Sequence, residues 1–145
     1  MTVNLQAKRA EYARNAVLSA SPARLLTMLY DRLLLDLARA ETAQQEANWP
    51  VASENLLHAQ DILAELSGTL KPGVWEGGEN LQAIYAYSLK TLMNANIGRN
   101  AVLTRECIDL LEPLRATWHE AAALVPALGA TPSAAMTPGG TLGVG

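Results

Sequence analysis

The sequence lacks phenylalanine entirely, has a single cysteine and carries only a small excess of negative charge. Without Phe, a core has to be built from Leu, Ala, Ile, Val and Met, and Leu and Ala are strong helix formers. One cysteine excludes an internal disulfide framework. The formal net charge is -3, and the Lys and Arg residues are spread singly along the chain. This distribution argues against a nucleic-acid-binding protein, because such proteins usually carry a basic face.

Long hydrophobic runs are also absent. No segment approaches the roughly 18 consecutive apolar residues of a membrane-spanning helix. The first residues, Met1 to Tyr12, contain no apolar stretch of the kind found in a secretory signal. We therefore expect a cytoplasmic protein. With 145 residues, half of them hydrophobic, the chain has the size of one domain with a substantial core.

Apolar residues recur at intervals of three and four in four segments, which predicts four amphipathic helices. The expected helices cover Pro22–Gln45, the stretch from the break at Asn48 to Lys71, Glu79–Ile97, and the stretch from Asn100 to about Val125. Pro113 lies within the last of these, and we expect one helix that bends there. Short connections between such helices favour an all-α, antiparallel four-helix bundle.

The composition changes towards both ends of the chain. Residues 1–20 form a polar arm, residues 21–128 the predicted bundle, and residues 129–145 a tail. The tail contains five Gly, two Pro and no charged residue. Such a segment cannot build a core, so we predict that it is disordered.

Catalytic and metal-binding patterns are not found. A di-iron bundle needs Glu-x-x-His, but the residues three before His58 and His119 are Asn55 and Ala116. Both histidines are expected on polar or boundary faces, and Cys107 as a small buried residue. The acidic residues Asp31, Asp36, Asp61 and Glu65 are expected on outer helix faces. We therefore predict no enzyme and no catalytic, cofactor or metal site.

A binding function remains, and tyrosines are its best signal. Tyr12 lies in a polar arm, where a large aromatic residue suggests a docking role, although it could equally be an incidental surface residue. Tyr85 and Tyr87 lie about 200° apart around a helix, so if Tyr85 faces the core, Tyr87 should lie near the surface. Alanines on the helix seams suit either shallow grooves for a partner or, more simply, tight packing between helices: Ala52, Ala59, Ala95, Ala121 and Ala122.

Three segments resemble the flagellar secretion chaperone FliS family. The first is Tyr12-Ala13-Arg14-Asn15-Ala16-Val17 followed by Ala20-Ser21-Pro22, Leu25 and Met28-Leu29-Tyr30-Asp31. The second comprises Asn80-Leu81, Ile84-Tyr85, Tyr87, Leu92 and Ala95-Asn96, and the third Leu111, Leu114-Arg115 and Trp118. Their order and spacing are similar to the family pattern, and together they cover Tyr12 to Ala122. Ala86 and Ser88 depart from it, where the family usually has Asp and Met. Pro113 and the Gly-rich tail are also unusual for the family.

The resemblance implies an antiparallel helical chaperone without cofactors. Its partner would be the disordered C-terminal segment of flagellin, which would lie in grooves between helices and be kept from polymerising. It also implies delivery of flagellin to the flagellar export gate, and an N-terminal arm that covers part of the cargo surface when cargo is absent. The residues we predict to bind the partner are Tyr12, Val17, Leu56, Leu63, Tyr85, Tyr87, Leu92, Asn96 and Trp118. The alternative is a generic helical adaptor that binds another partner helix.

Overall fold

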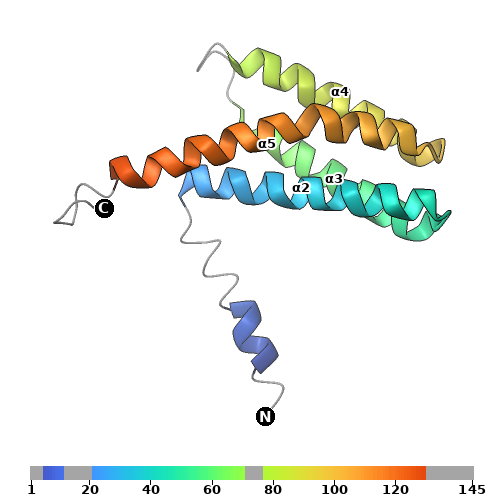
Figure 1. Cartoon of the computed structure of the whole chain (residues 1–145), viewed down its shortest axis with the longest axis horizontal. Coiled ribbons are helices and arrows are strands. Elements are labelled where there is room, and N and C mark those ends of the chain that lie inside the picture. The colour runs from blue at the N-terminus through green and yellow to red at the C-terminus, as the bar shows by residue number, and fades with distance from the viewer. Residues whose placement is uncertain (1–4, 12–20, 71–76, 130–145) are drawn as a thin grey trace. The chain divides into compact units, whose positions relative to one another are not determined.

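The computed structural model describes residues 5–11, 21–70 and 77–129, with side chains described up to residue 124 (Figure 1). Residues 5–11 are helical, and four long helices follow. They are α2 (Pro22–Gln45), α3 (Trp49–Thr69), α4 (Gly77–Ile97) and α5 (Ala101–Gly129). Within the described ranges there is no strand, which confirms the all-α prediction. The predicted helix bounds agree to within two residues at the ends that the structure describes, except that α5 continues to Gly129, four residues beyond its expected end near Val125.

The chain divides into two units, which we describe separately. One unit is Leu29–Thr117 and holds most of the four long helices. The other combines Met1–Met28 with Trp118–Gly145. The predicted boundaries of arm, bundle and tail stay predictions, since residues 12–20 and 130–145 lie outside the described residues.

The helix starts follow the cap signals in the sequence. At the start of α2, the Arg24 amide donates to the Ser21 hydroxyl at 3.2 Å. At the start of α3, the Val51 amide donates to the side chain of Asn48 at 3.4 Å, and Pro50 occupies the first turn. The Asn100 side chain accepts from the Val102 amide at 2.9 Å at the start of α5. Each cap satisfies a backbone N–H that has no partner inside its helix.

The core of the unit Leu29–Thr117 is built from the predicted apolar stripes. Its largest side chains, all less than 2 % exposed, include Tyr30, Leu33, Leu37, Leu56, Leu63, Leu66, Tyr85, Leu92 and Leu111. Cys107 is fully buried among them, as predicted. α3 packs along α4. Side-chain hydrogen bonds join α2 to α3, α4 and α5, and join α4 to α5. Burying each large apolar side chain contributes about 1.5–3 kcal/mol, so these stripes account for the cohesion of the bundle.

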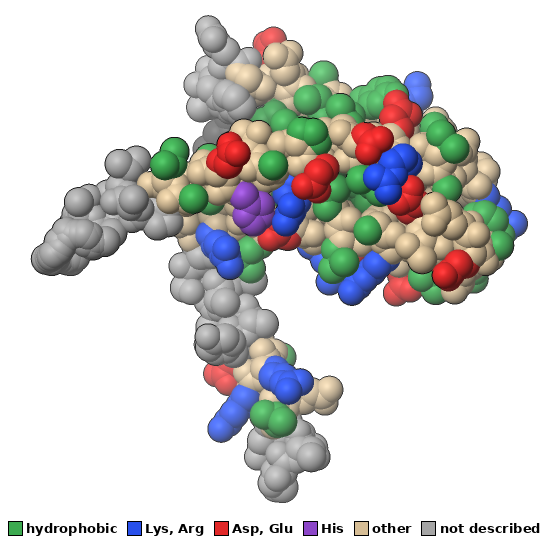
Figure 2. Space-filling view, viewed as in Figure 1, with side chains coloured by type: hydrophobic (Ala, Val, Ile, Leu, Met, Phe, Trp, Pro, Cys, Tyr) green, Lys and Arg blue, Asp and Glu red, His purple; other side chains and the backbone are tan. Residues whose placement is uncertain are grey.

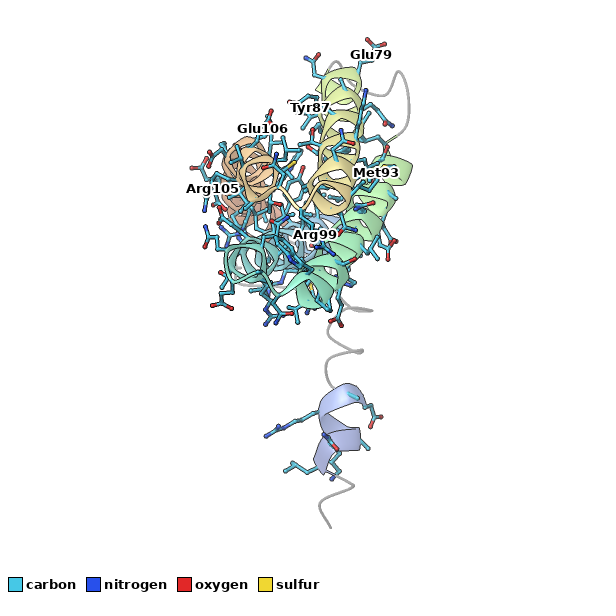
Figure 3. All side chains as sticks on the ribbon, turned by 90° about the vertical axis from the view of Figure 1, so that its right-hand side faces the viewer. Glu79, Tyr87, Met93, Arg99, Arg105 and Glu106 are labelled. Atoms are coloured by element: carbon cyan, nitrogen blue, oxygen red, sulfur yellow. The ribbon has the colours of Figure 1, made fainter. Side chains whose placement is uncertain are left out.

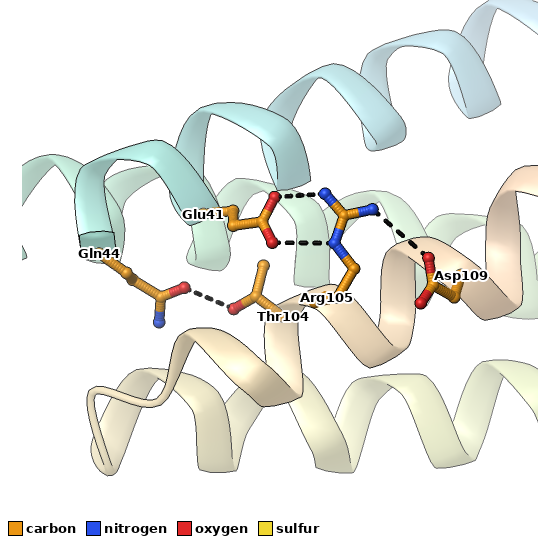
Figure 4. Close-up of polar contacts among 5 residues, drawn as sticks. All are labelled: Glu41, Gln44, Thr104, Arg105 and Asp109. Carbon is orange, nitrogen blue, oxygen red and sulfur yellow. Dashed lines mark hydrogen bonds and ion pairs between the residues drawn. The ribbon is translucent and has the colours of Figure 1, made fainter. Parts of the chain in front are cut away.

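Hydrogen bonds of the buried Gln44 side chain connect α2, α4 and α5 near one end of this unit. The Gln44 side chain of α2 donates to the Ala95 carbonyl of α4 at 3.2 Å. Its oxygen accepts from the Thr104 hydroxyl of α5 at 2.7 Å (Figure 4). Close by, the Arg105 guanidinium forms two bonds with Glu41 across the same helix pair, at 2.9 and 2.6 Å. These directional contacts fix the register of α5 against α2 in a way that apolar packing alone does not.

One acidic residue was wrongly expected on an outer face. The Asp36 side chain on α2 is fully buried. Its carboxylate accepts from Arg32 of the preceding turn at 3.0 Å and pairs with the His58 ring of α3. The helical period places Asp36 beside the seam with α3, and the two partners make burial of the carboxylate tolerable there.

Candidate partner-binding groove

A surface groove follows the seam between α2 and α3. It consists of two depressions of about 380 and 520 Å³, which share Arg39 of α2 and Asn55 of α3. The first lies towards the α2–α3 connection and includes Asn48 and Val51. The second lies around the buried Asp36. Because they share these residues, the two depressions are neighbours along the helix pair.

Small side chains explain why the groove exists. On α2, Ala38, Thr42 and Ala43 face this seam and leave space that larger side chains would fill. On α3, Val51 is 38 % exposed and Leu57 is 52 % exposed, and both line the groove. Apolar walls of this kind can accept apolar side chains of a partner segment at helical spacing.

The groove carries charges of both signs. Arg32 and Arg39 lie along it on α2, with Glu54 and Asp61 on the α3 side. Acidic and basic side chains are likewise interspersed with apolar ones on the face that carries α2 and α5 (Figure 2). Mixed charge beside apolar walls fits an amphipathic polypeptide better than a polyanion.

Four of the partner-binding residues predicted from the sequence lie in the interior of the bundle. Leu56, Leu63, Tyr85 and Leu92 are at most 1 % exposed. Their side chains pack inside the bundle and offer no surface, so a partner could reach them only if the helices separated. The apolar stripes on which they lie are fully used by helix–helix packing, which also accounts for the burial of Ala52, Ala59 and Ala95. At these three alanines the tight-packing alternative is the correct one.

The other predicted residues lie in different places. Tyr87 is 50 % exposed and donates a hydrogen bond to Glu106 of α5 (Figure 3). This bond raises the pKa of Tyr87. Asn96 is half-buried at the C-terminal end of α4, and Trp118 is half-buried in the other unit. Tyr12 and Val17 lie outside the described residues. The structure therefore does not gather the predicted residues into one site.

Sequence reasoning missed the groove residues because it followed the apolar stripes. Leu57 falls off the stripe of α3 that Leu56 and Leu63 define. Its side chain is 52 % exposed and lines the groove. An apolar residue on an otherwise polar helix face was the available signal.

The described residues provide little for reaction chemistry. Among them, no three His, Cys, Asp or Glu side chains gather closely enough to hold a metal ion. Burial raises the pKa of Cys107 to about 12, which makes it a poor nucleophile near neutral pH. No helix in the described part of the chain is long and apolar enough to cross a membrane.

A helical bundle with an apolar-walled groove on its surface has a shape that can accept an amphipathic polypeptide segment. The family model described as "Flagellar protein FliS" matches residues 4–125 of the chain. This protein belongs to the FliS family.

Individual relatives agree with this assignment. The chain is 31 % identical over 110 residues to a protein named flagellar secretion chaperone FliS from Bacillus subtilis, covering 76 % of this chain and 82 % of the relative. It is 32 % identical to the protein of that name from Salmonella typhimurium, covering 73 % and 80 % of the two chains. The fold resembles a crystal structure of a flagellar chaperone from bacteria, with a TM-score of 0.65 at 17 % identity, over 83 % of this chain and 98 % of that chain.

Proposed function

We propose that this protein is a flagellar export chaperone that binds the disordered C-terminal segment of flagellin in the α2–α3 groove. The observation that carries the proposal is the coincidence of family membership with a groove that has exposed apolar walls at Val51 and Leu57. Covering that segment would prevent flagellin from polymerising before export. The protein would then deliver flagellin to the export gate.

The physical properties of the groove suit a segment that folds as it binds. Such a segment loses conformational entropy on binding, so its affinity per unit of buried area is lower than that of a preformed partner. Apolar side chains at helical spacing would enter between Val51 and the small residues Ala38 and Thr42 of α2. The charged rim would fix the register of the segment rather than supply most of the affinity.

Calorimetric titration with a flagellin C-terminal peptide tests this proposal. We expect a dissociation constant in the micromolar range or below, which corresponds to about −8 kcal/mol or better. Ala38→Trp should fill the groove and weaken binding at least tenfold, because Ala38 is exposed and lines the first depression. The matched control is Ala116→Trp, an exposed alanine on α5 that does not line the groove. Equal loss of affinity in both variants would reject the α2–α3 groove as the binding site.

The alternative function is a helical adaptor that uses the same groove for a different helix. Affinity capture from the native cell separates the two functions. Recovery of flagellin supports the chaperone. Recovery of other helical proteins with no flagellin supports the adaptor.

A further inference from the structure

A second pocket lies at the end of the Leu29–Thr117 unit where two helix connections meet. Its volume is about 530 Å³, within the range of ligand-binding pockets. Trp49, at the start of α3, and Ile97, at the end of α4, provide apolar walls. Ser53 and Asn96 add polar groups. Arg99 lies in the α4–α5 connection at this end of the bundle (Figure 3).

Arg99 is the charged group of this pocket. Its guanidinium carbon lies 5.1 Å from the centroid of the Trp49 ring, a cation–π arrangement. No carboxylate lines the pocket. Arg99 has no ion pair within the described part of the chain, whereas Arg105 and Arg115 each pair with carboxylates. The pocket therefore presents a positive charge beside an aromatic surface.

The turn itself does not require arginine at this position. Arg99 has a φ of 51°, and Ala47 in the α2–α3 connection has a φ of 58°. The two connections have matching hydrogen bonds: Asn100 to the Ala95 carbonyl at 2.9 Å, and Asn48 to the Ala43 carbonyl at 2.7 Å. Ala47 adopts the left-handed conformation in the α2–α3 connection without a long side chain. The side chain of Arg99 is therefore not needed to form the equivalent turn between α4 and α5.

We propose that this pocket binds the C-terminal residue of a polypeptide that ends in an apolar side chain. The α-carboxylate would pair with Arg99, and the side chain would lie between Trp49 and Ile97. A C-terminal residue carries both groups on one Cα atom, which suits a pocket that Arg99 lines together with the apolar side chains of Trp49 and Ile97. The inference does not rest on the α2–α3 groove, because the two sites share no lining residue.

Backbone amide signals of the ¹⁵N-labelled full chain provide the test. The probes are acetyl-Ala-Ala-Leu with a free carboxylate, the same peptide with a C-terminal amide, and acetyl-Leu-Asp-Ala-amide with an internal acid. We expect the acid peptide to shift signals at Trp49–Ser53 and Asn96–Arg99. It should bind about two- to fivefold more tightly than the amide, since the cation is exposed to solvent.

Variants test whether Arg99 causes the preference for the acid peptide over the amide peptide. Arg99→Gln should remove the difference between acid and amide peptides, while far-UV circular dichroism confirms that the chain stays folded. Lys90→Gln changes another exposed cation, which lines neither this pocket nor the α2–α3 groove, and it should keep the preference. Three results would overturn the proposal. The acid and amide peptides could bind equally well, the internal aspartate peptide could bind as tightly as the free acid, or millimolar peptide could leave these signals unmoved.

Discussion

The buried carboxylate of Asp36 provides a sharp test of how α2 and α3 are held together. Its side chain is fully buried, while the side chains of its partners Arg32 and His58 are 51 % and 48 % exposed. Removing a partner leaves a buried charge less well compensated. Removing the charge itself eliminates the cost of desolvation. Replacing His58 and replacing Asp36 should therefore change the free energy of unfolding by different amounts, although both changes remove the same contact.

We predict that His58→Ala lowers the free energy of unfolding by about 1–3 kcal/mol, the range for losing a hydrogen bond to a buried charged group. The loss should be below the roughly 3–5 kcal/mol of a fully buried pair, because Arg32 still reaches the carboxylate. Asp36→Leu should stay within about 1 kcal/mol of the original protein, because an apolar side chain of similar size needs no partner.

Urea denaturation of both variants and of the double variant measures the coupling. In the Asp36→Leu background, His58→Ala should cost close to nothing, so the coupling energy should be about 1–3 kcal/mol. Asp109→Asn is the control, since Asp109 is 68 % exposed, and it should change stability by less than about 0.5 kcal/mol. An equal cost of His58→Ala in both backgrounds would refute the reasoning.

Three further predictions concern the interior of the same unit. The Tyr30 and Tyr85 hydroxyls are 2.7 Å apart and buried, so either Tyr→Phe change should cost about 1–2 kcal/mol in urea denaturation. The double change should cost clearly less than the sum of the single changes, and additive costs would contradict the pairing. Gln44→Leu should cost about 1–3 kcal/mol, because the buried Thr104 hydroxyl loses its acceptor and the Ala95 carbonyl loses one of its donors, whereas an unchanged midpoint would contradict that role. Cys107, with its pKa raised to about 12 from 9.0, should react with a disulfide reagent roughly a thousandfold more slowly in the native protein than in denaturant. Native labelling within tenfold of the unfolded rate would show that the thiol is accessible.

The sequence predicted the fold well because local signals and the global fold agree. Ser21, Asn48 and Asn100 each cap a helix as their residue types suggest. The alternating steps of three and four residues predicted amphipathic helices, and Leu56 and Leu63 on the apolar stripe of α3 are buried. These features depend on neighbours within one or two turns, which a sequence displays directly.

The binding surface was harder to predict, because it depends on which helix faces remain exposed once the helices have packed together. Leu56 and Tyr85 were predicted to contact the partner, yet both side chains are buried in the packing between helices. Asp36 looked like a surface residue until its partner His58, 22 positions away, was placed beside it. Long-range contacts of this kind leave no periodic trace in the sequence.

The proposed function is that this bundle holds flagellin unassembled by means of the groove between α2 and α3. Co-expression with the flagellin of the same organism, followed by size-exclusion chromatography, tests it most directly. The account predicts a soluble one-to-one complex that Ala38→Trp disrupts and Ala116→Trp preserves. Flagellin that elutes apart from the unaltered protein, or that polymerises in its presence, would contradict the account.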